Sequence, residues 1–165
     1  MSRWISIFFG VGLLRPAPGT WGSAVAVLLG LVILRYHGFP VLVVAAVAAT
    51  ALGFWSVGRE LAEHPGTDPS EIVIDEVAGQ WIALLFPAAA FWWRGSTDWM
   101  PYPGWVAAFV FFRLFDIWKP WIIGRADRRT DPAGVMLDDI LAGLFAGIAT
   151  ILAAGAAHGL MFLWR

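Results

Sequence analysis

Residues 137–164 read LDDILAGLFAGIATILAAGAAHGLMFLW, and this stretch decides the class of fold. Its ionisable side chains are those of Asp138, Asp139 and His158. A membrane-spanning helix needs about 20 predominantly apolar residues, so this run is long enough to cross a bilayer. Small residues four positions apart let neighbouring helices approach closely. Such pairs here are Ala142/Ala146, Gly143/Gly147 and Gly155/Gly159. The sequence therefore predicts a transmembrane helix that packs closely against others.

Four more apolar blocks precede this stretch. They cover residues 21–36, 40–57, 72–93 and 104–118. Turn signals separate them, with HGFP after the first block and MPYPG before the fourth. The run Asp68-Pro69-Ser70-Glu71 is typical of a helix start, because Asp can cap the helix and Pro suits its first turn. We predict an all-α, integral membrane helical bundle of about five helices, in a single domain over residues 1–165.

The composition agrees with a membrane protein. Of the 165 residues, 59% are hydrophobic and 14% are charged, whereas soluble domains have about 45–50% apolar and about 25% charged residues. The net charge of −1 gives no basic field that would attract a nucleic acid. The chain has no cysteine, which excludes disulfides, cysteine-ligated metals and thiol nucleophiles.

The apolar segment at residues 4–14 is too short and too interrupted by glycine to be a span, so we interpret it as interfacial or re-entrant. Basic residues cluster on the cytoplasmic side of membrane proteins. With five spans and a cytoplasmic N-terminus, seven basic residues fall inside and three outside. The inside set is Arg3, Arg15, Arg59, Lys119, Arg125, Arg128 and Arg129, and the outside set is Arg35, Arg94 and Arg165.

The acidic residues of the spans gather at one membrane face in this topology. Ionisable groups within spans are costly and usually mark a functional site. Here all of those carboxylates fall at the cytoplasmic interface, in three different helices. They are Asp75, Glu76, Asp116, Asp138 and Asp139.

Five carboxylates in one place repel each other strongly unless protons or cations neutralise them. Mg²⁺ prefers oxygen ligands and often shares its coordination with a substrate phosphate. The three histidines, at positions 37, 64 and 158, are dispersed, and the chain has no cysteine, so a zinc site is not expected. The acids therefore predict a magnesium site.

A row of alternating charge lies beside these acids. Arg113, Asp116 and Lys119 are three residues apart, so they can share one face of a helix. A phosphate monoester next to a metal needs such cations to neutralise its oxygens. Simpler interpretations remain open: Asp138 and Asp139 as helix caps, Asp116 as a salt-bridge partner of its neighbours, and residues 18–20 as an ordinary turn.

Four ordered motifs extend this pattern along nearly the whole chain. They are PGTWGS at 18–23, DPSEIVIDEVAG at 68–79, FRLFDIWKP at 112–120 and GVMLDDILAG at 134–143. Together they resemble the phosphatidylglycerophosphatase A family. The chain departs from the family at Ile122-Ile123, where a further Pro is frequent, and at Pro132-Ala133-Gly134, where extra Gly is usual. Both departures affect a loop, not the acids.

The resemblance implies a Mg²⁺-dependent phosphatase in the bacterial inner membrane, with its site facing the cytoplasm. Family members remove the terminal phosphate of phosphatidylglycerophosphate and leave phosphatidylglycerol. The residues themselves predict a membrane protein that binds a divalent cation and a phosphate group, whereas the phospholipid substrate comes from the resemblance alone. No protein partner is indicated.

With this reaction in mind, roles can be assigned as hypotheses. Asp75, Glu76, Asp138 and Asp139 would hold one or two Mg²⁺. Asp116 would be a further ligand or the general base, and Arg113 and Lys119 would neutralise the phosphate. The hydroxyls of Thr20 and Ser23, with nearby backbone N–H groups, would cradle a phosphate oxygen.

Two other functions are compatible with clustered acids in a membrane. A CDP-alcohol phosphotransferase would carry an Asp-x-x-Asp-Gly-x-x-Ala-Arg run, which this sequence lacks. A non-enzymatic ion or proton carrier would place its acids near the bilayer midplane. Within the phosphatase hypothesis, a covalent aspartyl-phosphate route also remains open.

Overall fold

The computed structural model describes residues 1–63, 69–96, 99–129 and 131–163, and in these ranges all regular structure is helical. The helices are α1 (Ser2–Ser6), α2 (Pro18–His37), α3 (Phe39–Glu63), α4 (Ile74–Trp93), α5 (Gly104–Trp118), α6 (Ile122–Asp127) and α7 (Pro132–Leu163). Two short 3-10 helices, η1 (Phe8–Leu13) and η2 (Pro69–Glu71), complete the set. The predicted all-α bundle is confirmed, because α2, α3, α4, α5 and α7 fall on the five apolar blocks.

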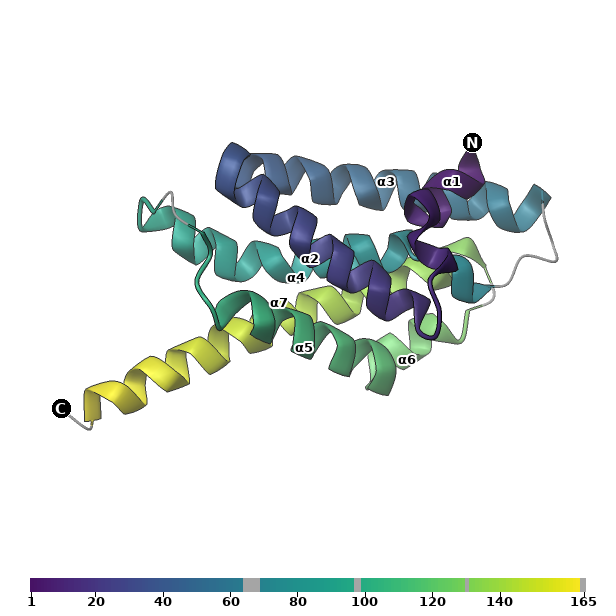
Figure 1. Ribbon diagram of the computed structural model, residues 1–165. Helices are drawn as coiled ribbons and strands as arrows, with labels where there is room; N and C mark the ends of the chain where they lie inside the picture. The colour runs from purple at the N-terminus through teal and green to yellow at the C-terminus, as the bar shows by residue number, and fades with distance from the viewer. Residues whose placement is uncertain (64–68, 97–98, 130, 164–165) are drawn as a thin grey trace.

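Four of these helices, α2, α3, α4 and α7, are long and apolar enough to cross a membrane. Helix α5 differs, because its 15 residues make a helix of about 22 Å, shorter than a hydrocarbon core of about 30 Å. It nevertheless runs back along α4, so its two ends lie near opposite ends of the bundle (Figure 1).

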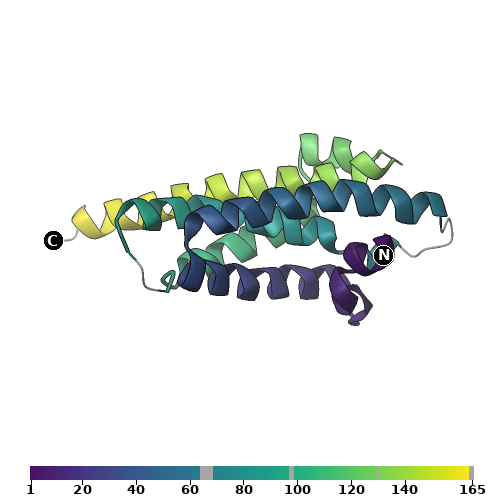
Figure 2. The same cartoon turned by 90° about the horizontal axis from the view of Figure 1, so that it is seen from above.

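Successive long helices run in opposite directions, and this brings the segments that carry the predicted site residues together. The start of α4, the end of α5, helix α6 and the start of α7 lie at one end of the bundle, together with the N-terminal segment (Figures 1 and 2). The connections from α2 to α3 and from α4 to α5 lie at the other end. The last turns of α7 extend away from the bundle.

Several helix boundaries differ from the prediction. Residues 18–20, for which an ordinary turn was one interpretation, lie instead in the first turn of α2, which begins at Pro18, because a proline at the first helical position suits the helix start. Asp68 lies outside the described residues; Pro69–Glu71 form a separate 3-10 turn, and α4 begins only at Ile74. Helix α6 was not predicted.

The N-terminal segment packs against the bundle through ion pairs and a backbone hydrogen bond. The Arg3 guanidinium forms ion pairs with Glu60 of α3, at 3.0 Å, and Glu71 of η2, at 2.8 Å. The backbone N–H of Val73, just before α4, donates a hydrogen bond to the carbonyl oxygen of Ser6. These contacts hold α1 against the segment that leads into α4, at the end of the bundle where the acids lie.

Helices α4 and α7 touch through glycine. A Cβ atom on Gly143 would overlap the carbonyl oxygen of Gly79, and one on Gly79 would overlap the carbonyl oxygen of Asp139. Gly147 likewise lies against the ring of Phe86. The predicted close approach is thus confirmed for this half of α7, whereas a Cβ atom on Gly155 would meet no atom of the other described segments within 4 Å.

Helix α7 begins earlier than predicted and has its own cap. The Asp131 carboxylate accepts a hydrogen bond from the backbone N–H of Gly134, at 3.0 Å, and pairs with Arg129, at 2.6 Å. The hydrogen bond from Arg129 is the main cause that lowers the pKa of Asp131 to about 2. Asp138 and Asp139 therefore lie about two turns inside the helix and do not cap it.

Asp131→Ala is expected to lower the melting temperature at pH 7 by roughly 2–4 °C, because the cap and its ion pair are lost. The depressed pKa makes this stabilisation present above the pKa of an unfolded Asp, about 3.9, and lost as the pH falls through about 2. Melting curves of both proteins in detergent should therefore converge between pH 4 and pH 2. A difference that stays constant over that range would contradict this assignment.

Candidate active site

The structure brings all five predicted acids together. Oxygen atoms of Asp75, Glu76 and Asp139 lie within 4.8 Å of one another, and so do oxygen atoms of Asp116, Asp138 and Asp139. The two groups share Asp139, which makes it the centre of the cluster. A spacing of this size allows three carboxylates to bind one cation, so the arrangement can hold one or two metal ions.

The positions of the acids follow from the helices. Asp75 and Glu76 lie in the first turn of α4, where the positive end of the helix dipole favours negative charge. The glycine contact between Gly79 and Gly143 brings α4 against α7 and so places Asp139 beside Asp75. Asp116 comes from the last turn of α5.

These carboxylates are largely removed from solvent. Asp139 is 3% exposed, Asp138 7% and Asp75 8%. Buried oxygen atoms of Glu76, Asp138 and Asp139 have no hydrogen-bond partner among the described residues. A buried anion without a partner is costly, so the oxygen-only donor set fits a hard divalent cation. Such a group of acids can therefore bind a metal ion.

Two cationic side chains, those of Arg113 and Lys119, lie beside the acids. Arg113 of α5 pairs with Asp116 at 2.5 Å, and the same guanidinium nitrogen donates to the hydroxyl of Ser23 on α2 at 3.4 Å. Asp116 is thus a salt-bridge partner of Arg113, as the simpler interpretation held, and it also belongs to the acid cluster. Arg113 links α2, α5 and the acids.

Lys119 approaches the cluster from the end of α5. Its backbone adopts the left-handed conformation, with φ at 49°, a strained geometry for a non-glycine residue. Its ammonium group pairs with Asp138 at 2.8 Å and also with Asp127 of α6. Partial burial disfavours the charge, but the hydrogen bonds to Asp127 and Asp138 outweigh it and raise the pKa of Lys119. Lys119 therefore stays cationic at physiological pH.

The two hydroxyl residues of the predicted phosphate cradle, Thr20 and Ser23, lie near the start of α2. Ser23 is fully buried, and its hydroxyl donates to the carbonyl oxygen of Gly19 at 2.8 Å while it accepts from Arg113. Thr20 is partly exposed in the same first turn of α2. The glycine of this motif serves another purpose, because Gly19 lies directly against the carboxylate of Glu76, where a side chain would overlap it.

Two contributors were missed by the sequence reasoning. Asp127 was not among the predicted site residues, yet it pairs with Lys119; no spacing rule connects the two, because Asp127 lies on α6 and Lys119 follows α5. Gly19 was interpreted only as part of a turn, and its contact with Glu76 depends on the packing of α2 against α4.

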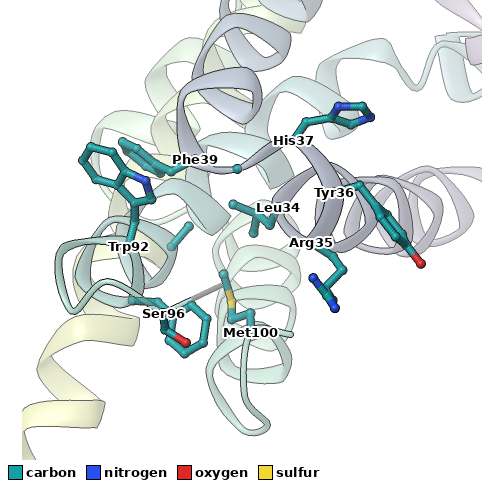
Figure 3. A pocket seen from close by; sticks show the side chains of 11 residues that line it. Leu34, Arg35, Tyr36, His37, Phe39, Trp92, Ser96 and Met100 are labelled. Carbon is teal, nitrogen blue, oxygen red and sulfur yellow. The ribbon is translucent and has the colours of Figure 1, made fainter. Parts of the chain in front are cut away.

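The hollow shown in Figure 3 is a separate feature. It lies where α2 meets α3 and where α4 ends, and its lining includes Arg35, Tyr36, Phe39, Trp92 and Met100. This is the end of the bundle away from the acids. The hollow therefore does not contain the carboxylates and is not the metal site.

Comparison with known proteins decides the family. The sequence model of the phosphatidylglycerophosphatase A family matches residues 4–154, a range that contains all four motifs. The chain belongs to this family. Membership makes it a phosphatase.

Relatives agree with that assignment. The phosphatidylglycerophosphatase A of Haemophilus influenzae is 34% identical over 145 residues, which cover 87% of this chain and 83% of the relative. The phosphatidylglycerophosphatase A of Escherichia coli is 34% identical over 149 residues, with 87% and 78% covered. A Bacteroides thetaiotaomicron protein named "Putative phosphatidylinositol-3-phosphatase" is 34% identical over 149 residues, with 88% of each chain covered. No solved structure matches the chain.

Proposed function

We propose that this phosphatase hydrolyses the terminal phosphate monoester of phosphatidylglycerophosphate, to give phosphatidylglycerol and inorganic phosphate, with Mg²⁺ held by its acids. The observation that carries the proposal is the arrangement of the acids in two groups of three that share Asp139, with Arg113 and Lys119 beside them. The family and the names of two relatives support the lipid substrate.

Asp75, Glu76, Asp138 and Asp139 would be the Mg²⁺ ligands, because their oxygens converge and several of them are buried without a partner. Bound there, Mg²⁺ supplies a more acidic water and neutralises phosphate charge. Asp116, whose oxygen lies near those of Asp138 and Asp139, would complete the coordination or accept a proton from the attacking water.

Arg113 and Lys119 would bind the phosphate oxygens. Each pairs with a carboxylate of the cluster, so each lies beside the acids that would hold the cation. Their charges offset the charge that develops as the phosphorus–oxygen bond to glycerol breaks and the bond to water forms. Ser23 would hold the Arg113 guanidinium in place from α2.

The proposed setting is the cytoplasmic face of the bacterial inner membrane. The start of α4, the end of α5 and the start of α7, which carry the acids, lie at one end of the bundle (Figure 1), and this favours an enzyme that acts on headgroups over a carrier. Trp118 and Trp121 flank Lys119 and are 69% and 76% exposed, which suits side chains at a membrane interface. The acyl chains of the substrate would then stay in the bilayer.

A phosphoinositide is the second candidate substrate, because the name of the Bacteroides relative includes one. Both lipids present a phosphate monoester on a polyol headgroup, and the charged groups described above suit either. The two candidates therefore differ in headgroup fit and not in chemistry.

Phosphate release by the purified full chain tests the proposal. In detergent with short-chain lipids, we expect release from phosphatidylglycerophosphate with Mg²⁺, loss of release with a chelator, and recovery when Mg²⁺ is added in excess. Phosphatidylinositol 3-phosphate serves as the competing substrate under the same conditions. Absence of Mg²⁺-dependent release from phosphatidylglycerophosphate would reject the proposal, and faster release from the phosphoinositide would reassign the substrate.

A further inference from the structure

Gln80 of α4 is a buried polar residue that the roles above do not use. Its side chain is fully buried, and neither the nitrogen nor the oxygen of its amide has a hydrogen-bond partner among the described residues. A buried amide without partners is unfavourable. The Gln80 amide therefore needs hydrogen-bond partners that the described residues do not supply.

The position of Gln80 on α4 places it next to the active site. It follows Glu76 by four residues, so the two side chains lie on the same face of the helix. Its neighbour Gly79 lies against the ring of Phe112, where a Cβ atom would be 2.7 Å from a ring carbon. Phe112 directly precedes Arg113, so α4 at Gln80 and α5 at Arg113 lie side by side.

Arg113 and Glu76 have bonding capacity left at this point. One terminal nitrogen of Arg113 contacts both Asp116 and Ser23, whereas its Nε is buried without a hydrogen-bond partner in the described chain. One carboxylate oxygen of Glu76 lies against Gly19, and the other, Oε2, is likewise buried and unpartnered. The amide of Gln80 offers what each of these atoms lacks: an acceptor for Arg113 Nε–H and a donor for Glu76 Oε2.

We propose that Gln80 is a positioning residue that joins Arg113 to Glu76, directly or through one ordered water, when the site is loaded. A buried water commonly bridges about three otherwise unsatisfied polar groups, so one water would bond Arg113 Nε–H, Glu76 Oε2 and one end of the Gln80 amide. It would direct the guanidinium toward the phosphate and the Glu76 carboxylate toward the cation. This inference rests on the proposed phosphatase function.

Gln80→Met tests the role, because methionine fills a similar volume without hydrogen bonds. We expect kcat/KM to fall on the order of tenfold and the Mg²⁺ concentration for half-maximal thermal stabilisation to rise by a similar factor. The melting temperature without metal should stay equal or rise, because an unpartnered amide has been removed. Leu84→Met, one turn further along the same face and also fully buried, is the packing control and should change none of these values.

A double-mutant cycle with Arg113→Lys identifies the partner, because lysine has no Nε–H to donate. In the Arg113→Lys background, Gln80→Met should lower kcat/KM by less than about twofold. If Gln80→Met lowered kcat/KM by the same factor in the Arg113→Lys background as in the wild type, the proposal would be overturned. An unchanged Mg²⁺ midpoint would also overturn it, as would a lower melting temperature with intact catalysis, which would mean a structural role. Because the Mg²⁺ midpoint is measured without substrate, failure of the wild type to release phosphate would count against the proposed function alone.

Discussion

Asp139→Asn is expected to lower phosphate release roughly a thousandfold while the protein remains folded. Asp139 is the one carboxylate common to both groups of acids, and it is only 3% exposed. Asparagine keeps the size of the side chain but removes the charge that a cation needs. Because both groups lose a ligand at once, this change should be more damaging than the same change at any other acid of the cluster.

The matched control is Glu63→Gln, which removes an acid whose side chain is 50% exposed and pairs with Arg59 on α3. Initial rates of phosphate release at saturating Mg²⁺ should be unchanged in this control. The rate of phosphate release by Asp116→Asn should lie between those of Asp139→Asn and Glu63→Gln, because Asp116 belongs to one group of acids only. If Asp139→Asn kept a rate within tenfold of the wild type, the cluster would not be the catalytic metal site.

Gly143→Leu is expected to destabilise the bundle by more than about 3 kcal/mol and to abolish activity, since overpacking of this kind forces the backbone apart. Any side chain at Gly143 overlaps the carbonyl oxygen of Gly79, and Gly79 in turn touches the backbone of Asp139. Relief of the overlap therefore separates α4 from α7. That separation also moves Asp75 away from Asp139.

Gly155→Leu makes the same substitution on the same helix and is the control. A Cβ atom there meets nothing within 4 Å, so melting temperature and activity should stay near the wild-type values. Thermal unfolding in detergent, followed by phosphate release from the folded fraction, separates the two effects. Equal melting temperatures for the two variants would show that the contact between α4 and α7 does not hold the site together.

The bundle and the location of its acids were predictable because they depend on local properties. Apolar length marks the helices, and their alternating direction carries Asp75, Asp116 and Asp139 to one end. The three-residue spacing of Arg113, Asp116 and Lys119 added the two cations as partners. These predictions needed only residue type, spacing and the charge of the loops.

The remaining features depend on contacts between distant segments. Arg113 reaches Ser23 across 90 positions of sequence, and Gly19 meets Glu76 only because α2 packs on α4. Residues 18–20 could be interpreted as a turn because glycine and proline are frequent in turns, but Pro18 starts a helix instead. Likewise, only the position of Asp131 at the start of α7 shows that Asp138 and Asp139 are not caps.

Direct binding of a divalent cation tests the central claim most sharply. Mn²⁺ can take the place of Mg²⁺ on oxygen ligands, and its electron paramagnetic resonance signal distinguishes free from bound ion. Titration of the metal-free wild-type protein should show saturable Mn²⁺ binding that Mg²⁺ displaces, and Asp139→Asn should weaken it strongly while Glu63→Gln leaves it intact. Binding that is absent from the wild type, or equally tight in Asp139→Asn, would contradict the assignment of these acids as a metal site.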